Sequence, residues 1–297
     1  MRRRLLQILL FLLLLFALDR GTAALLLKGL ERYFGLGSPA EVLLVGHSHM
    51  MQGIDAARLQ TGLHRPVAKY CREGVTLDDR RAMIEHFLHT HPHGNPDWVV
   101  LAVDPFMPGI EVLGRNSYKL FYPFLDDPAM RDHVRKQSSR SDFLLHLAVH
   151  TARYDDEMLN RALHGLLGLH RNHRTGTIPD DLLPQGIYTT VPAPQPMQTL
   201  RDTVRSLTAR GMHVLLLNLP VYRCYRDSAP AAFDANNALF AELAREEPGV
   251  SYLDYNPLYS HRRELFYDLI HLNAQGQQLI TDRLARDLAE LMQRGKR

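Results

Sequence analysis

The chain has 297 residues, a formal net charge of +3 and only two cysteines. So small a charge, to which arginines at the N-terminus contribute, argues against a nucleic-acid partner. Two cysteines are too few for a disulfide scaffold. Cys71 and Cys224 are either a pair formed in an oxidising compartment or two separate buried thiols.

The N-terminus carries a segment typical of membrane targeting. Three arginines at positions 2–4 precede an apolar run over residues 5–18, and a charged pair, Asp19-Arg20, closes it. The run is short for a membrane span, which needs about 20 apolar residues, but apolar residues resume at 23–27. We expect an uncleaved signal anchor over residues 1–37 rather than a cleaved signal peptide, which is the alternative. The arginines would stay in the cytoplasm and the remainder would be exported.

The remaining residues, 38–297, are enough for one α/β domain with an insertion. Short apolar stretches alternate with amphipathic ones, which predicts a parallel sheet with helices on both faces. Strands are expected at residues 42–45, 66–71, 97–103, 213–220 and 250–255, and helices at 77–89, 197–210, 231–246 and 274–292. The fold class is therefore three-layer α/β with a flavodoxin-like parallel sheet.

Residues 106–194 interrupt this alternation and are predicted to be an insertion that recognises substrate. Its aromatic stretch, residues 117–125, has the sequence SYKLFYPFL. These rings either stack on sugar rings or pack together in a small core of their own.

A serine follows the first predicted strand. The sequence VLLVGHSHMMQGID at residues 42–55 places Ser48 on a tight turn that Gly46 permits, just before a helical pattern. Helix N-termini favour anions, which suits a nucleophile that forms an oxyanion. Taken alone, such a serine is more often a helix cap.

A possible base for this serine lies near the other end of the chain. In YDLIHLNAQG, residues 267–276, Asp268 and His271 are three residues apart, just before the last predicted helix. A carboxylate at this spacing can orient an imidazole whose other nitrogen faces a serine. Because loops at the carboxyl edge of a parallel sheet converge, we expect Ser48, His271 and Asp268 to meet there as nucleophile, general base and orienting acid.

These two motifs resemble the first and last blocks of the SGNH, or GDSL-type, hydrolase superfamily. With its N-terminal anchor, the chain is most similar to the branch that includes the D-alanyl-transfer protein of lipoteichoic acid modification and the alginate O-acetylation proteins. The resemblance implies a partner, a multi-span membrane O-acyltransferase, and a glycan acceptor. It also implies a single-pass protein of the cytoplasmic membrane with a periplasmic catalytic domain.

The middle blocks of the family match less well. Gly74, after the second strand, corresponds to the oxyanion glycine, so the backbone N–H groups of Ser48 and Gly74 are the expected oxyanion donors; a simple turn glycine is the alternative. The family's third-block asparagine has no counterpart, because Asp104-Pro105 ends the strand. A carboxylate aimed at an oxyanion would oppose its charge, so Asp104 must serve another purpose. Asp104 and Asn218, both at strand ends, are candidate substrate contacts.

The resulting hypothesis is an anchored, extracytoplasmic serine acyltransferase or esterase acting on O-acyl groups of a cell-envelope or secreted glycan, without a cofactor. One alternative is a polysaccharide or lipid esterase that only hydrolyses. Another is a non-catalytic envelope scaffold on a degenerate fold. The pair His47 and His49 could bind a metal ion. However, no carboxylate or third histidine lies near them in sequence, so we expect no metal site.

Overall fold

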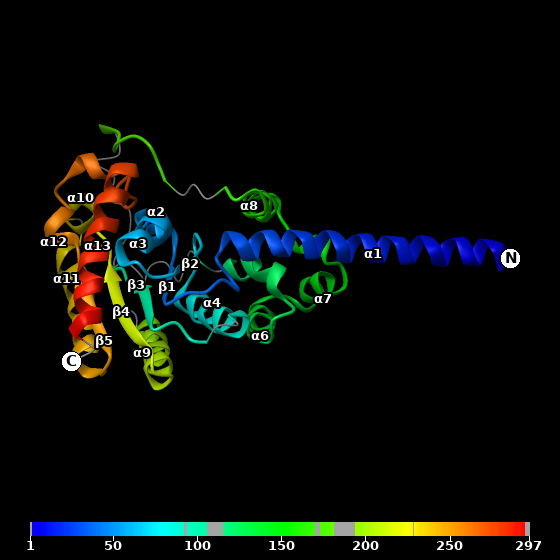
Figure 1. Cartoon of the computed structure of the whole chain (residues 1–297), viewed down its shortest axis with the longest axis horizontal. Coiled ribbons are helices and arrows are strands. Elements are labelled where there is room, and N and C mark those ends of the chain that lie inside the picture. The colour runs from blue at the N-terminus through cyan, green and yellow to red at the C-terminus, as the bar shows by residue number, and fades with distance from the viewer. Residues whose placement is uncertain are drawn as a thin grey trace. The chain divides into compact units, whose positions relative to one another are not determined.

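A computed structural model of the chain describes residues 2–91, 94–105, 114, 116–169, 173–180, 194–227 and 229–294, with the side chains of 194–196 excepted. The chain divides into two compact units (Figure 1). Unit 1 comprises Met1–Gly37 and Asn116–His170, and unit 2 comprises Ser38–Arg115 and Arg171–Arg297. Much of the predicted insertion, 106–113 and 181–193 in particular, lies outside the described residues.

Unit 2 is built on a five-stranded parallel sheet with the order β2-β1-β3-β4-β5, so the predicted flavodoxin-like fold is confirmed. Its elements are β1 (Val42–Gly46), α2 (Ser48–Gly53), α3 (Ala56–Leu63), β2 (Val67–Cys71), α4 (Leu77–Thr90), β3 (Trp98–Ala102), α9 (Pro194–Ala209), β4 (His213–Asn218), α10 (Arg223–Asp227), α11 (Pro230–Glu246), β5 (Val250–Asp254), α12 (Asn256–Tyr259), η4 (Arg263–Leu265) and α13 (Ala274–Arg294).

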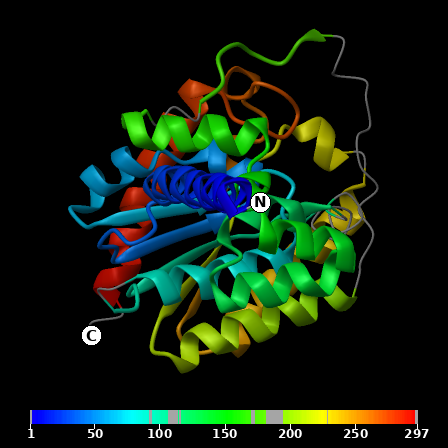
Figure 2. The same ribbon diagram turned by 90° about the vertical axis from the view of Figure 1, so that its right-hand side faces the viewer.

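The central strands are apolar throughout because helices cover both faces of the sheet. Every residue of β1 and β3 is buried. Helices α3 and α13 pack together on one face, and α4 and α9 pack together on the other (Figure 2). This arrangement leaves the carboxyl edge of the sheet as the place where loops from distant parts of the sequence meet.

Unit 1 consists of the N-terminal helix and part of the predicted insertion. Its elements are α1 (Arg2–Tyr33), η1 (Ser117–Phe124), α6 (Pro128–Gln137), α7 (Arg140–Ala148), η2 (Thr151–Arg153) and α8 (Asp156–Leu167). Helix α1 is long and apolar enough to cross a membrane. Its C-terminal half packs on α8 at very short range, since a Cβ atom at Gly29 would lie 2.1 Å from the carbonyl oxygen of Ala162.

The aromatic stretch of the insertion forms η1 and packs within unit 1. Tyr118, Phe121, Tyr122 and Phe124 are all buried, and the ring of Phe124 meets that of Phe34 edge-on. Rings buried in this way have no free face for a sugar. Of the two interpretations of this stretch, the structure therefore shows the internal core.

The two cysteines are both free thiols, Cys71 buried on β2 and Cys224 half-buried on α10. They do not form a disulfide, which leaves the second of the two alternatives drawn from the sequence. Burial raises the pKa of the Cys71 thiol to about 12, so it stays protonated at neutral pH.

Candidate active site

Ser48 lies at the carboxyl end of β1, as the first residue of α2. The chain leaves the strand at Gly46, where a Cβ atom would lie 2.7 Å from the Cβ atoms of both Ala102 and Met50. Only a glycine lets the turn pass so close to the neighbouring strand and to its own helix. Ser48 is half-buried, whereas its neighbours on either side are buried. Its hydroxyl is therefore the accessible polar group of the turn.

His271 and Asp268 lie on the loop that precedes α13. An isolated bridge between Phe266 and Leu272 closes this loop at its base. The Oδ1 atom of Asp268 accepts hydrogen bonds from the backbone N–H groups of Ile270 at 2.8 Å and His271 at 2.7 Å. The carboxylate is thus fixed by the turn that it caps.

The side chains of Ser48, His271 and Asp268 form a continuous hydrogen-bonded chain. His271 Nδ1 is 2.8 Å from Asp268 Oδ2, and His271 Nε2 is 2.9 Å from Ser48 Oγ. A carboxylate can only accept here, so the neutral ring donates from Nδ1 and presents its Nε2 lone pair to the hydroxyl. This is the geometry required for an imidazole to take a proton from serine. The structure therefore brings together the three residues that were selected from the sequence.

The carboxyl group of Asp268 remains ionised in this arrangement. Burial raises its pKa, but the hydrogen bond and charge of His271 and the backbone N–H groups outweigh burial. The pKa of Asp268 consequently lies below its ordinary value. An ionised Asp268 stabilises the imidazolium that forms when His271 accepts a proton.

A segment of the insertion lies over the loop that carries His271. The side-chain amide of Asn273 donates to the backbone oxygen of Gly176 at 2.8 Å, and the Ala274 N–H donates to that of Arg174 at 2.8 Å. Arg263 donates to the backbone oxygen of Ile178. The part of the insertion at residues 173–180 therefore borders the candidate site.

Asp104, whose role the sequence leaves open, is the hub of a second, buried network. The carboxylate is 1% exposed and accepts hydrogen bonds from both histidines that flank Ser48. His47 bonds through Nε2 to Oδ2, and His49 bonds through Nδ1 to Oδ1 at 2.6 Å. Burial raises the pKa of Asp104, but the two histidines outweigh it and hold the pKa well below its ordinary value.

The remaining ring nitrogens of the two histidines have different partners. His47 Nδ1 accepts from the backbone N–H of His49 at 3.1 Å, so this ring is neutral, and burial lowers its pKa to about 4. His49 Nε2 faces the carbonyl oxygen of Pro220 at 3.1 Å, and a carbonyl only accepts. Both ring nitrogens of His49 thus face acceptors. The network is a buried carboxylate held between two histidine rings, of which His47 is neutral.

This network ties the Ser48 turn to the carboxyl ends of β3 and β4, and it changes the interpretation of Asp104. Each carboxylate oxygen of Asp104 accepts a hydrogen bond from one histidine ring. The buried side chain therefore supports the Ser48 turn rather than contacting a substrate. The expectation that no carboxylate lies near His47 and His49 holds only along the sequence. In the folded chain the Asp104 carboxylate lies between His47 and His49 and accepts a hydrogen bond from each ring. Among the residues that the structure describes, no group of His, Cys, Asp or Glu is arranged to hold a metal.

Two further candidates differ in their placement. Gly74 lies in the turn between β2 and α4, with a φ of +67° that side chains rarely adopt. Two residues earlier, the Arg72 N–H donates to the Gly46 oxygen, so this turn begins beside the Ser48 turn. Asn218 is fully buried at the end of β4, and its amide donates to Asn237 Oδ1 at 2.9 Å. Asn218 is therefore not positioned to contact a substrate.

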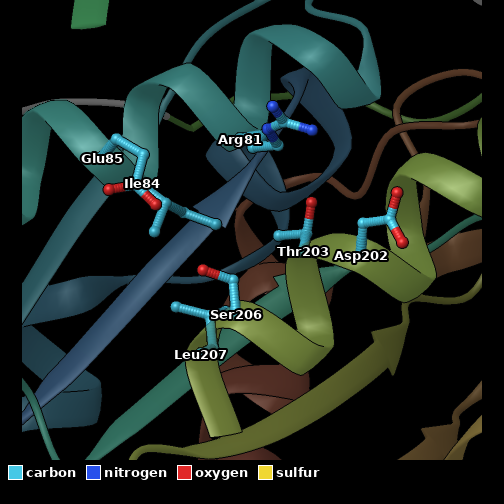
Figure 3. Close-up of a pocket in the computed structure, with 7 residues that line it drawn as sticks. All are labelled: Arg81, Ile84, Glu85, Asp202, Thr203, Ser206 and Leu207. Atoms are coloured by element: carbon cyan, nitrogen blue, oxygen red, sulfur yellow. The ribbon is translucent and has the colours of Figure 1, made fainter. Parts of the chain in front are cut away.

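An open pocket of about 360 Å³ lies elsewhere in unit 2, between α4 and α9 (Figure 3). Arg81 and Glu85 contribute from α4, and Asp202, Thr203 and Ser206 from α9. Its lining contains none of the Ser48, His271 and Asp268 side chains. We assign it no role in the chemistry of Ser48.

No protein-family model matches the chain, and no curated protein sequence matches it. Solved structures with a similar fold include TesA, at 16% identity and a TM-score of 0.45, covering 82% of this chain and 94% of that one. They also include the catalytic domain of peptidoglycan O-acetyltransferase A from Streptococcus pneumoniae (14% identity, TM-score 0.39, 84% and 93%) and a catalytic mutant of an acetylxylan esterase from Geobacillus stearothermophilus (14%, 0.41, 84% and 94%). Similarity at this level bears on neither the family nor the activity of this chain.

Proposed function

We propose that this chain is a membrane-anchored serine acyl hydrolase or acyltransferase in which Ser48 is the nucleophile. The observation that carries the proposal is the hydrogen-bonded chain from Ser48 through His271 to Asp268, with distances of 2.9 Å and 2.8 Å. The serine is half-buried at the edge of a parallel sheet where substrates ordinarily bind.

The reaction follows from the arrangement of protons. His271 Nε2 takes the Ser48 hydroxyl proton as Oγ attacks an ester or thioester carbonyl, and Asp268 stabilises the imidazolium. The Nε2 proton then passes to the leaving group, and an acyl ester remains on Ser48. An acceptor hydroxyl gives its proton to His271 and attacks this ester, which releases the acylated acceptor and restores the serine. Water in place of the acceptor gives hydrolysis.

The oxyanion would be held by backbone N–H groups, for which Ser48 and Gly74 remain the predicted donors. Two donors without a side-chain amide are a modest oxyanion site, since each donor contributes several kcal/mol to transition-state stabilisation. We therefore expect slow hydrolysis of small esters by the isolated protein.

The membrane and the acceptor complete the proposal. The apolar start of α1 with arginines at positions 2–4 supports a cytoplasmic N-terminus and an extracytoplasmic unit 2. In that compartment a glycan hydroxyl of the cell envelope or of a secreted polysaccharide is the proposed acceptor. A multi-span membrane O-acyltransferase is the proposed acyl source.

The test is labelling of the full-length protein in detergent with a fluorophosphonate probe, which reacts with activated serines. We expect wild type and a Ser206→Ala control to label at equal rates, Ser48→Ala to remain unlabelled, and His271→Ala to label at least 100-fold more slowly. Absence of labelling in wild type, or equal labelling of Ser48→Ala, would remove the basis of the proposal. Incubation of an acyl donor with a glycan then separates transfer from hydrolysis by the product formed.

A further inference from the structure

The exposed apolar part of α1 is too short to cross a bilayer by itself. Its large side chains between residues 5 and 18 are all at least 47% exposed. At 1.5 Å per residue, this segment is about 21 Å long. The hydrocarbon core of a membrane is about 30 Å thick. Roughly 9 Å of the span must therefore be supplied by α1 beyond Leu18 and by the parts of unit 1 that pack beside it.

The next residues of α1 are charged, and other groups of unit 1 form hydrogen bonds with both of them. The Asp19 carboxylate accepts hydrogen bonds from the backbone N–H groups of His150 at 2.9 Å and Thr151 at 2.8 Å, and from the Thr151 hydroxyl. Arg20 donates to the carbonyl oxygen of Ala148 at 3.1 Å. Charges that are paired and hydrogen-bonded enter a low-dielectric medium at a much lower cost than bare ones.

The end of α7 lies beside α1 (Figure 1), and several apolar side chains near this junction are exposed. Leu144 is 52% exposed, Leu145 50% and Val149 39%, and all three lie within four residues of Ala148. On α1 itself, Leu25 is 57% exposed beyond the charged pair. We call Leu25, Leu144, Leu145 and Val149 the collar.

We propose that the collar is immersed in the lipid bilayer and completes the span that α1 begins. A 30 Å core requires about 20 helical residues, so a span that starts at residue 5 ends near Leu25, at the level of the collar. Immersion removes the exposed parts of four large apolar side chains from water, which is favourable. The inference rests on the proposed membrane anchoring, not on the chemistry of Ser48.

Lipid is the occupant that the observations favour. Leu144, Leu145 and Val149 lie close to α1 just beyond its exposed apolar run, because Arg20 bonds to Ala148, and Leu25 lies within the missing length of the span. A transmembrane protein that covers the collar is the competing occupant. Vesicles that contain no other protein distinguish the two occupants. Lipid would cover the collar there, whereas a partner protein would be absent.

The experiment measures immersion with nitroxide labels on the full-length protein in vesicles of phosphatidylcholine and phosphatidylglycerol. The label is attached to Leu145→Cys or Val149→Cys in a Cys224→Ser background. Cys71 is retained because its 2% exposure keeps it from being labelled. Relaxation by oxygen reports lipid, and relaxation by a water-soluble nickel chelate reports water. Leu10→Cys, within the exposed apolar run, is the reference for a lipid-facing position.

Leu167→Cys is the matched control, because Leu167 is a 70% exposed leucine of the same unit. It follows Gly165, whose Cβ would lie 1.9 Å from the Gly29 oxygen, so it lies at least ten helical residues, or about 15 Å, beyond Asp19. We expect the oxygen-to-nickel ratio at 145 and 149 to be within about 2-fold of that at Leu10 and at least 5-fold above that at Leu167.

Ratios at 145 and 149 equal to that at Leu167, with a lipid-like ratio at Leu10, would overturn the proposal and leave a protein partner as the occupant. A water-like ratio at Leu10 would overturn the anchor and the collar together. Neither result changes the outcome of the fluorophosphonate test. Failure of the collar proposal and failure of the proposed activity are therefore distinguishable.

Discussion

Replacing Asp104 tests whether the buried network supports the Ser48 turn or takes part in chemistry. Asp104→Ala removes the acceptor for two ring N–H groups, in a place where Asp104, His47 and His49 are at most 3% exposed. A hydrogen bond to a charged group contributes about 1.5–3 kcal/mol, so loss of both bonds to the carboxylate costs roughly 3–5 kcal/mol. For a unit of about 200 residues this lowers Tm by roughly 10 °C.

Asp104→Asn is the matched control, because its amide can satisfy the same groups with one proton fewer. Its oxygen accepts from His47 Nε2, and its N–H donates to His49 Nδ1 when that ring carries its proton on Nε2. His49 still donates from Nε2 to the Pro220 oxygen, which lies 3.1 Å away. Only the charge-assisted part of the interaction is lost, about 1–2 kcal/mol.

The assay combines thermal unfolding in detergent with the rate of fluorophosphonate labelling of Ser48. We expect Asp104→Asn to keep labelling within about 10-fold of wild type at temperatures where it is folded, and Asp104→Ala to lose both stability and labelling. If folded Asp104→Asn is as inert as Ser48→Ala, the charge of Asp104 acts in the reaction and a purely supporting role is refuted. An unchanged Tm for Asp104→Ala would show that the network does not hold the turn.

Three other outcomes are expected from the same geometry. Asp268→Asn should slow labelling about 10²–10⁴-fold with little change in Tm, because the imidazole of His271 loses its orienting acceptor; normal labelling would contradict the assigned role. His47 stays neutral when folded, with a pKa of about 4 against 6.5 unfolded, so it contributes about 3 kcal/mol above pH 6.5 that is lost as pH falls toward 4. His47→Gln should flatten the pH dependence of stability between pH 4 and 6.5. An unaltered slope would show that His47 is not its source. Gly29→Ala should lower Tm because of the 2.1 Å backbone contact, whereas Gly21→Ala, with nothing within 4 Å, should not.

The sheet was predictable because each strand has its own sequence signal. Fully buried parallel strands are continuous apolar runs, and the observed strands agree with the predicted ones to within two residues at each end. The meeting of Ser48 with Asp268 and His271, more than 200 residues apart, was also predictable. It requires only that loops at one edge of a parallel sheet converge.

The supporting contacts were not predictable, because they depend on which way buried side chains turn. Asn218 occupies a strand end as expected, yet its amide turns to Asn237. Likewise, nothing near Gly29 in the sequence indicates the helix from the insertion that packs on it. Such pairings arise from tertiary packing between segments that have no local pattern in common.

His47, His49 and Asp104 form one coupled set of side chains around Ser48. The two ring nitrogens of His49 face two acceptors, the Asp104 carboxylate and the Pro220 carbonyl oxygen. His47 donates its single ring proton to the same carboxylate. An asparagine there has one acceptor oxygen for two rings, so it satisfies both only when His49 Nδ1 accepts from the amide instead of donating. We therefore expect the double variant His49→Ala/Asp104→Asn to lose less free energy of unfolding than the two single variants lose in sum. The double variant leaves no buried charge unpaired.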